Sequence, residues 1–309
     1  MRSRVIAARP NQRSSCTTTG DAVSSPFSWA VGTRTFGQSE LLRWARVKKT
    51  RRKVAEEKMS LLAKSLTLSG RRLVAASVRH HSLTTELIEN MDKKATWDRF
   101  YAESSNKTTT FKNFEWFFGF DAVRDFIMPL LQTESHPDAL LQVLDMGCGT
   151  SALGPCIFRH SAHPVQVTCA DISPIAVRLM QEHVRAKAIQ PHNLCSQLEF
   201  VELDCTQLHR HYGCNSVDLI VDKGTTDALL RSKEGRGKAS LVLKQCLKVL
   251  RSSGSVLQFS DEDPDARLLW LETEAQEPGV MAADVGVQEV GELRGMSYYC
   301  YQVTPRPIA

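Results

Sequence analysis

Four aspartates in this chain have the type and spacing to bind a ligand that carries hydroxyl and amino groups. Each one ends a short apolar segment that is typical of a buried strand. The carboxyl ends of neighbouring parallel strands meet at one edge of a sheet, where a carboxylate can accept hydrogen bonds from two vicinal hydroxyls. The four residues that we expect at this edge are Asp145, Asp171, Asp204 and Asp222.

A glycine turn supplies the other half of such a site. In LLQVLDMGCGTSALG (residues 140–154), an apolar strand leads to Gly147 and Gly149 and then to a helix beginning near Thr150. Glycine permits the tight turn, and the unpaired N–H groups at a helix start attract anionic or polar ligand groups. The turn alone also fits a nicotinamide dinucleotide, although Ala152 occupies the position of the third glycine of that motif.

The elements that must position these residues alternate along the chain. Strands are expected at residues 165–170, 198–203, 217–221 and 255–259, and a C-terminal antiparallel pair at 285–290 and 296–303. Ser173 and Pro174 predict the cap and first turn of a helix over residues 175–187. Further helices are expected at residues 91–101, 120–131, 225–232, 239–250 and 268–273, with residues 234–237 forming a loop between two of them.

Over about residues 97–303, this pattern resembles the seven-strand S-adenosylmethionine-dependent methyltransferases. The resemblance implies an α/β, Rossmann-like sheet that is mostly parallel, ends in an antiparallel hairpin and carries helices on both faces. It also implies S-adenosylmethionine as cofactor. The methionine part would lie against Asp145, Gly147, Cys148 and Gly149, the ribose against Asp171 and Ile172, the adenine against Asp204 and Cys205, and Trp116 would cover the cofactor.

Two aromatic blocks narrow the resemblance to the branch that methylates protein lysines. They are WDRFY (residues 97–101) and FEWFFG (114–119), and DKGTTDA (222–228) belongs to the same pattern. By resemblance, the acceptor lysine comes to Asp222, with Lys223 beside it, and we expect Asp222 to position the amine. The alternative role of Asp222 is to cap the helix that starts at Gly224.

An acidic segment follows the fifth expected strand in QFSDEDPDARL (residues 258–268). Asp261, Glu262 and Asp263 are interpreted as a rim that attracts a cationic segment of the protein substrate, although acids also favour a helix N-terminus. The segment is similar to that of lysine methyltransferases of mitochondria, which implies citrate synthase as the substrate; a translation factor is the alternative acceptor.

Charge divides the chain into two parts. Residues 1–82 hold 17 Lys and Arg against 4 Asp and Glu (net +13), and the remainder holds 22 against 30 (net −8). The acidic remainder argues against a nucleic-acid partner. We expect residues 1–85 to be a disordered basic extension with a mitochondrial transit peptide that begins at Met59, and residues 86–309 to form the methyltransferase domain. The expected location is therefore the mitochondrial matrix.

The remaining composition restricts the class of protein. No apolar run is long enough to predict a membrane span. The nine cysteines form no C-x-x-C pair, and the histidine pairs lack partner ligands, so no metal site is expected. We expect a monomer. Three alternatives stay open from the sequence: a dinucleotide enzyme, a methyltransferase for RNA or a small molecule, and a non-catalytic protein that keeps the cofactor-binding fold.

Overall fold

The computed structural model describes residues 30–31, 87–106, 111, 113–132, 139–275, 282–293 and 295–306. Apart from residues 30–31, the expected basic extension and its transit peptide lie outside the described residues. Among the helices that are described, none is long and apolar enough to cross a membrane.

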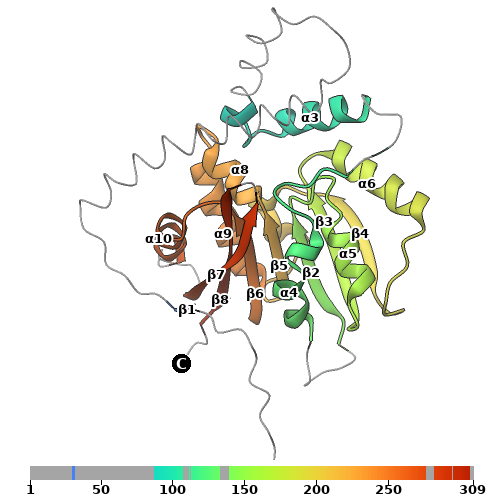
Figure 1. Ribbon diagram of the computed structural model, residues 1–309. Coiled ribbons are helices and arrows are strands. Elements are labelled where there is room, and N and C mark those ends of the chain that lie inside the picture. The colour runs from blue at the N-terminus through green and yellow to red at the C-terminus, as the bar shows by residue number, and fades with distance from the viewer. Residues whose placement is uncertain are drawn as a thin grey trace, which may run out of the picture.

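One mixed sheet forms the centre of the molecule (Figure 1). Its strand order is β1-β7-β8-β6-β5-β2-β3-β4, in which β6, β5, β2, β3 and β4 are parallel and β7 and β8 are antiparallel. The expected arrangement of a parallel sheet with a C-terminal hairpin is confirmed, and the two-residue β1 adds an eighth strand at the edge. The strands are β1(Ala30–Val31), β2(Leu141–Met146), β3(Val165–Asp171), β4(Gln197–Glu202), β5(Val217–Lys223), β6(Leu250–Ser260), β7(Ala283–Leu293) and β8(Met296–Pro305).

The chain order reverses at β2, which pairs with β3 on one side and with β5 on the other. In open parallel sheets, ligands bind outside the carboxyl ends of the strands at such a switch point. The register also decides which way the aspartates face. Asp145 pairs with Val221, so the next residue of β5, Asp222, faces the opposite side of the sheet.

Helices cover both faces of the sheet, as expected. One core contains Leu144, Ile220 and Val256 together with the helices on either side of β5 and after β6, and the other contains Val143, Leu219 and Leu257 together with the helices around β2 and β3. Alternate residues of each strand enter different cores because successive side chains point to opposite faces. The helices on the first face are α7(Leu208–His211), α9(Arg236–Val249) and α10(Pro264–Ala275), and those on the second are α4(Arg124–Ile127), α5(Leu153–His160) and α6(Pro174–Lys187).

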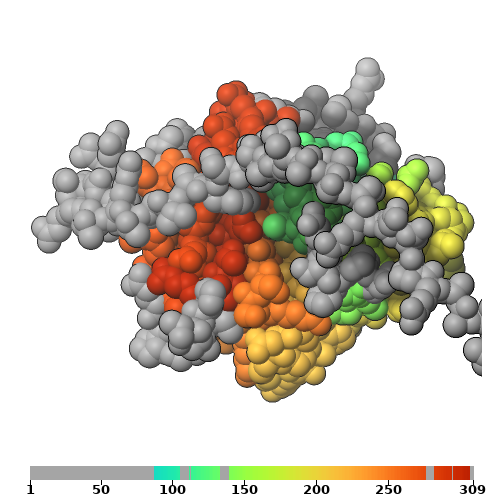
Figure 2. Space-filling model, turned by 90° about the horizontal axis from the view of Figure 1, so that it is seen from below, coloured from blue at the N-terminus to red at the C-terminus, as the bar shows by residue number. Residues whose placement is uncertain are grey.

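Two further helices lie above the sheet in Figure 1. These are α3(Lys94–Asn106) and α8(Thr225–Arg231). Seen from below, the red surface of the C-terminal hairpin and the yellow-green surface near β4 and α6 lie on opposite sides of the molecule (Figure 2). The C-terminal hairpin and β4 therefore lie towards opposite edges of the sheet, with β5, β2 and β3 between them.

Several expected elements have other bounds in the structure, and three of them differ as follows. Residues 120–131 form η1(Phe120–Ala122), α4 and η2(Met128–Leu131) instead of one helix, because Pro129 interrupts the hydrogen bonding. The expected loop at residues 234–237 is shorter, since α9 already begins at Arg236 after Gly235. Ser173 precedes α6 but does not cap it with its side chain; its hydroxyl donates to Asp98 at 2.6 Å.

Candidate cofactor and acceptor site

A cavity of about 370 Å³ opens at the carboxyl ends of β2, β3 and β5. This volume lies within the usual range for cofactor pockets, about 300 to 1,000 Å³. Its walls come from the glycine turn, from the ends of β2, β3, β4 and β5, from α8 and α9, from Phe114 and Trp116, and from residues in and before α3. All nine residues expected to bind the cofactor line it: Asp145, Gly147, Cys148, Gly149, Asp171, Ile172, Asp204, Cys205 and Trp116.

The glycine turn leaves no room for side chains. Gly147 and Gly149 have φ angles of +64° and +53°. A Cβ atom on Gly147 would lie 1.9 Å from the Thr225 hydroxyl oxygen, and one on Gly149 would lie 2.5 Å from the Tyr101 hydroxyl oxygen. Glycine is therefore required at both positions by backbone conformation and by the close approach of these two side chains.

Asp171 connects the end of β3 to the glycine turn. Its carboxylate accepts a hydrogen bond from the Gly149 N–H at 2.8 Å and another from the Ser173 N–H at 2.8 Å. Burial raises the pKa of Asp171 to about 6, against the lowering effect of those two donors. A carboxylate offers about four acceptor positions, so two remain for the hydroxyls of a ribose.

Asp145 connects the end of β2 to the start of α5. The residue is 2% exposed, and its carboxylate accepts the Gly154 N–H at 2.9 Å. Burial raises the pKa of Asp145 to about 7, and the nearby Lys223 ammonium opposes this rise. The carboxylate still lies on the cavity wall, where an ammonium group of a ligand would favour its ionised form.

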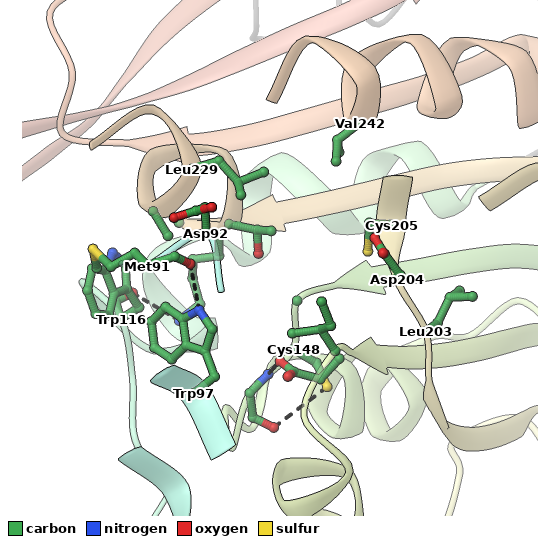
Figure 3. A pocket seen from close by; sticks show the side chains of 18 of the residues that line it. Met91, Asp92, Trp97, Trp116, Cys148, Leu203, Asp204, Cys205, Leu229 and Val242 are labelled. Atoms are coloured by element: carbon green, nitrogen blue, oxygen red, sulfur yellow. Dashed lines mark hydrogen bonds between the residues drawn. The ribbon is translucent and has the colours of Figure 1, made fainter. Parts of the chain in front are cut away.

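The end of the cavity beside the turn after β4 is suited to a planar ring. Figure 3 shows Leu203, Asp204, Cys205 and Val242 at this end. The Asp204 carboxylate accepts hydrogen bonds from the Thr206 N–H at 2.9 Å and from its hydroxyl at 2.7 Å, so it holds the turn after β4. The side chains of Leu203, Cys205 and Val242 provide the apolar surface that an adenine needs.

Lys223 has three oxygen partners. Its ammonium donates to Glu115 at 2.7 Å and to the carbonyl oxygens of Trp116 at 3.1 Å and Phe118 at 3.0 Å. Glu115 in turn accepts from the Ser151 hydroxyl and the Ala152 N–H. Lys223 thus ties the aromatic segment, residues 113–118, to the end of β5 and to the glycine turn. These contacts describe a structural cation on the cavity wall.

Asp222 is outside the residues that line the cavity. It is 1% exposed, and its carboxylate accepts from the Thr225 N–H at 2.9 Å, from the N–H and the hydroxyl of Thr226, and from the Gln258 amide at 3.3 Å. Burial raises the pKa of Asp222 to about 6. This geometry corresponds to the helix-capping role at α8. A direct role in positioning an acceptor amine stays a prediction.

The acidic segment after β6 makes its contacts with other residues of the protein. The Asp261 side chain is 5% exposed and pairs with Arg231 of α8. The Asp263 carboxylate accepts the Asp265 N–H at 3.1 Å, before the start of α10, and the Glu262 carbonyl oxygen accepts from the Tyr301 hydroxyl at 2.7 Å. None of the three residues lines the cavity in the described part of the chain, so any contact with a substrate would be made outside it.

Beneath that segment, α8 is attached to α10 by a buried ion pair. Arg267 is 1% exposed and its guanidinium donates to Asp227 at 2.5 Å, to Ser260 at 3.0 Å and to Gln258 at 3.3 Å. Since Gln258 also donates to Asp222, the cap of α8 and this ion pair belong to one polar network. Breaking one member of such a network leaves buried groups unpaired.

Comparisons with known proteins agree with this geometry. A family model described as "Methyltransferase domain" matches residues 137–285. The citrate synthase-lysine N-methyltransferase, mitochondrial, of Danio rerio is 62% identical over 226 residues, which cover 73% of this chain and 88% of that protein. The chain belongs to this methyltransferase family. The protein of the same name from Homo sapiens is 40% identical over 67% of this chain and 84% of its own length.

A more distant relative is the EEF1A lysine methyltransferase 4 of Mus musculus, 28% identical over 56% of this chain and 62% of that protein. Membership of the family establishes S-adenosylmethionine as the cofactor, and the cavity fits that molecule by its volume, by the two buried carboxylates on its wall and by the acceptor positions left on Asp171. The relatives are mitochondrial by name, in agreement with the expected organelle. The expected fold, enzyme class and cofactor are thus confirmed.

Several cavity residues were absent from the sequence-based site. The most prominent are Met91, Asp92, Trp97, Tyr101 and Thr225. Trp97 and Tyr101 stand in the aromatic block WDRFY, and Thr225 stands in DKGTTDA, so both motifs contained a signal. Met91 and Asp92 lie just before α3 and carry no motif. They reach the cavity only because this segment packs against α8 and α9.

Proposed function

We propose that this protein transfers methyl groups from S-adenosylmethionine to a lysine side chain of citrate synthase in the mitochondrial matrix. The observation that carries the proposal is the 62% identity with a relative whose name states this activity. The cavity supports it independently, since it combines the cofactor-binding aspartates with an aromatic end that a lysine side chain can enter.

The reaction requires a neutral amine. A lysine of ordinary pKa, about 10.4, is neutral in only about one molecule in a thousand near pH 7. S-adenosylmethionine supplies a sulfonium-bound methyl group, whose bond electrons stay on sulfur as the new C–N bond forms. The protein's part is to bind the lysine, to lower its pKa by partial desolvation so that the proton leaves to solvent, and to align the nitrogen.

The aromatic segment and the glycine turn perform the alignment in this proposal. Lys223 holds Trp116 over the cavity, and Gly224 allows this because its φ is +97° and a Cβ there would lie 2.2 Å from the Trp116 ring. Asp222 acts through the turn it caps, because its bonds to Thr225 and Thr226 fix the backbone that follows Lys223. We propose Asp222 as a positioning residue.

Methyl transfer to purified citrate synthase tests the proposal. The full chain, incubated with radiolabelled S-adenosylmethionine and citrate synthase, should label the acceptor, and peptide mass spectrometry should place the methyl groups on a lysine. Loss of the label in the Asp171→Ala variant controls for contaminating activity. No label on citrate synthase, with S-adenosylhomocysteine still bound, would contradict the proposed substrate.

Elongation factor 1A is the second candidate acceptor, because a 28% identical relative is named for it. The same assay with that protein, at equal concentration, separates the two. Labelling of the elongation factor alone would favour this second candidate.

A further inference from the structure

A lysine ammonium of the protein itself lies at one end of the cavity. Lys238, near the start of α9, donates to the Asp92 carboxylate at 2.9 Å and to the Asp92 carbonyl oxygen at 2.8 Å. Asp92 and Lys238 both line the cavity. The Asp92 side chain is 2% exposed, whereas that of Lys238 is 46% exposed. The carboxylate is therefore fixed, and the ammonium reaches it on a stem that extends from solvent.

The other cavity aspartates are engaged differently. The described bonds of Asp145, Asp171 and Asp204 come from N–H groups and a hydroxyl of the turns beside them. Asp92 instead combines the Ser232 hydroxyl with a side-chain ammonium. Burial alone would raise the pKa of Asp92, but these two donors outweigh it and lower the pKa. The position is thus suited to an ionised carboxylate that holds a cation.

The surroundings of Asp92 suit the rest of a lysine side chain. In Figure 3, Met91, Asp92, Trp97 and Trp116 gather at one end of the cavity, away from Leu203, Asp204 and Cys205 at the other. Trp97 and Trp116 meet edge to face with their ring centroids 6.2 Å apart. Apolar and aromatic walls accommodate the methylene stem of a lysine and attract an ammonium, methylated or not.

We propose that Asp92 is the docking carboxylate for the acceptor lysine, and that Lys238 occupies this place until the substrate lysine displaces it into solvent. This inference rests on the proposed lysine methyltransferase function. An incoming lysine exchanges one ammonium for another at the same carboxylate, so the charge of the site does not change. The carboxylate favours the ammonium form while the lysine docks, and the apolar walls favour the neutral amine, so the proton must leave to solvent against the attraction of Asp92. Asp92 then accepts an N–H of the neutral amine and orients its lone pair into the cavity.

Substitutions of Asp92 and of Lys238 should change the KM for the protein substrate in opposite directions. Asp92→Asn removes the charge that receives the substrate ammonium, and the KM for the protein substrate should rise by about tenfold or more. Lys238→Ala removes the competitor, and the same KM should fall by several fold. Lys248→Ala is the matched control, because it removes an exposed charge from the same helix away from the cavity and should leave KM unchanged.

A purely structural role would produce another pattern. If the contacts only fasten residues 87–93 to α8 and α9, Lys238→Ala and Ser232→Ala should both lower the melting temperature and raise KM. If Asp92 instead holds the amino group of the cofactor, Asp92→Asn should weaken S-adenosylhomocysteine binding as strongly as it raises KM. Either result would overturn the proposal. Cofactor affinity within a few fold of wild type supports it.

Binding of n-butylammonium, a lysine side-chain analogue, tests the docking site without methyl transfer. The full chain saturated with S-adenosylhomocysteine is titrated, and the indole N–H signals of the tryptophans report binding by NMR. Lys238→Ala should bind the amine several fold more tightly than wild type, and Asp92→Asn should lose the binding. Equal affinity in all three proteins would overturn the inference, even if citrate synthase is methylated. Conversely, the expected order would support it if citrate synthase is not the acceptor.

Discussion

Asp171 is the last residue of β3 and Asp222 is the last residue but one of β5, and burial raises the pKa of both to about 6. Their surroundings nevertheless differ. Asp171 lines the cavity and its bonds hold the glycine turn, whereas Asp222 faces the other side of the sheet and caps α8. A raised pKa at a strand end therefore does not identify a residue that touches a ligand. Whether the side chain can reach the cavity depends on the face of the sheet to which it points.

Replacement of Asp171 should have the largest effect on cofactor binding. Asp171→Ala removes the two charge-assisted hydrogen bonds that we propose to the ribose, each contributing about 1.5 to 3 kcal/mol, so the affinity for S-adenosylhomocysteine should fall by about 100-fold or more. Calorimetric titration measures this. An affinity within threefold of wild type would show that Asp171 only supports the glycine turn.

Replacement of Asp222 should act mainly on stability. Asp222→Ala removes a cap and leaves the Thr226 hydroxyl without its buried acceptor, while the Gln258 amide keeps its bond to the Thr226 oxygen at 3.0 Å, so the free energy of unfolding should fall by about 2 to 3 kcal/mol. Denaturant titration measures the loss. S-adenosylhomocysteine affinity should change only a few fold, and a drop in kcat at saturating substrates with unchanged stability would instead show a direct role at the acceptor.

The two strand ends should also differ in their response to pH. Asp171 must be ionised to accept the ribose hydroxyls, so cofactor affinity should rise about tenfold from pH 5 to pH 7, and Asp171→Asn should remove much of this rise.

The free energy of unfolding of the protein without ligand should change with pH in the direction opposite to cofactor affinity. Because the folded-state pKa values of Asp171 and Asp222 exceed the ordinary value of 3.8, ionisation disfavours the folded state. Their contribution to stability falls as pH rises from about 4 through 6, and calorimetry without ligand should show this.

A substitution at Asp261, just after β6, should have the smallest effect on stability of those considered. Asp261→Asn leaves Arg231 without its charged partner, and we expect a loss of about 1 kcal/mol of unfolding free energy with little change in the KM for the protein substrate. Glu262→Gln serves as the matched change in the same segment. If Asp261→Asn raises KM and weakens its salt dependence without loss of stability, the segment acts as the rim that its charge suggests.

The parts of the fold that were predictable from the sequence are local. The strand at residues 141–146, the turn at Gly147 and Gly149 and the helix after it lie within 20 residues of one another, and each has a residue pattern of its own. The hairpin of β7 and β8 was predictable for the same reason. All nine expected cofactor residues line the cavity, and eight of them, all except Trp116, do so because strand ends in a parallel sheet must meet at one edge.

The remaining features depend on distant pairs. Lys223 and Glu115 are 108 residues apart in the sequence, and Lys238 and Asp92 are 146 apart. No local pattern reports such contacts. The face of the sheet to which Asp222 points follows only from the register of β5 against β2. The early start of α9 was not predictable either, because Gly235 and Arg236 have the composition of a loop and become helical where α9 packs on the sheet.

The three-oxygen contact of Lys223 has a consequence for the rate at which the cofactor exchanges. Residues 113–118 are fastened by a side chain that is 4% exposed, whereas α3 is joined to the sheet by the ion pair of Lys94 and Glu202, which are 41% and 53% exposed, and by the bond of Asp98, 29% exposed, with Ser173. Exposed ion pairs open at little cost, and buried ones do not. The segments that line the cavity on this side, α3 and residues 113–118, should therefore begin to open at α3. Amide hydrogen exchange should be fast in α3 and slow at residues 114–118. Residence of the cofactor would then be limited by the motion of α3 while the aromatic segment remains in place.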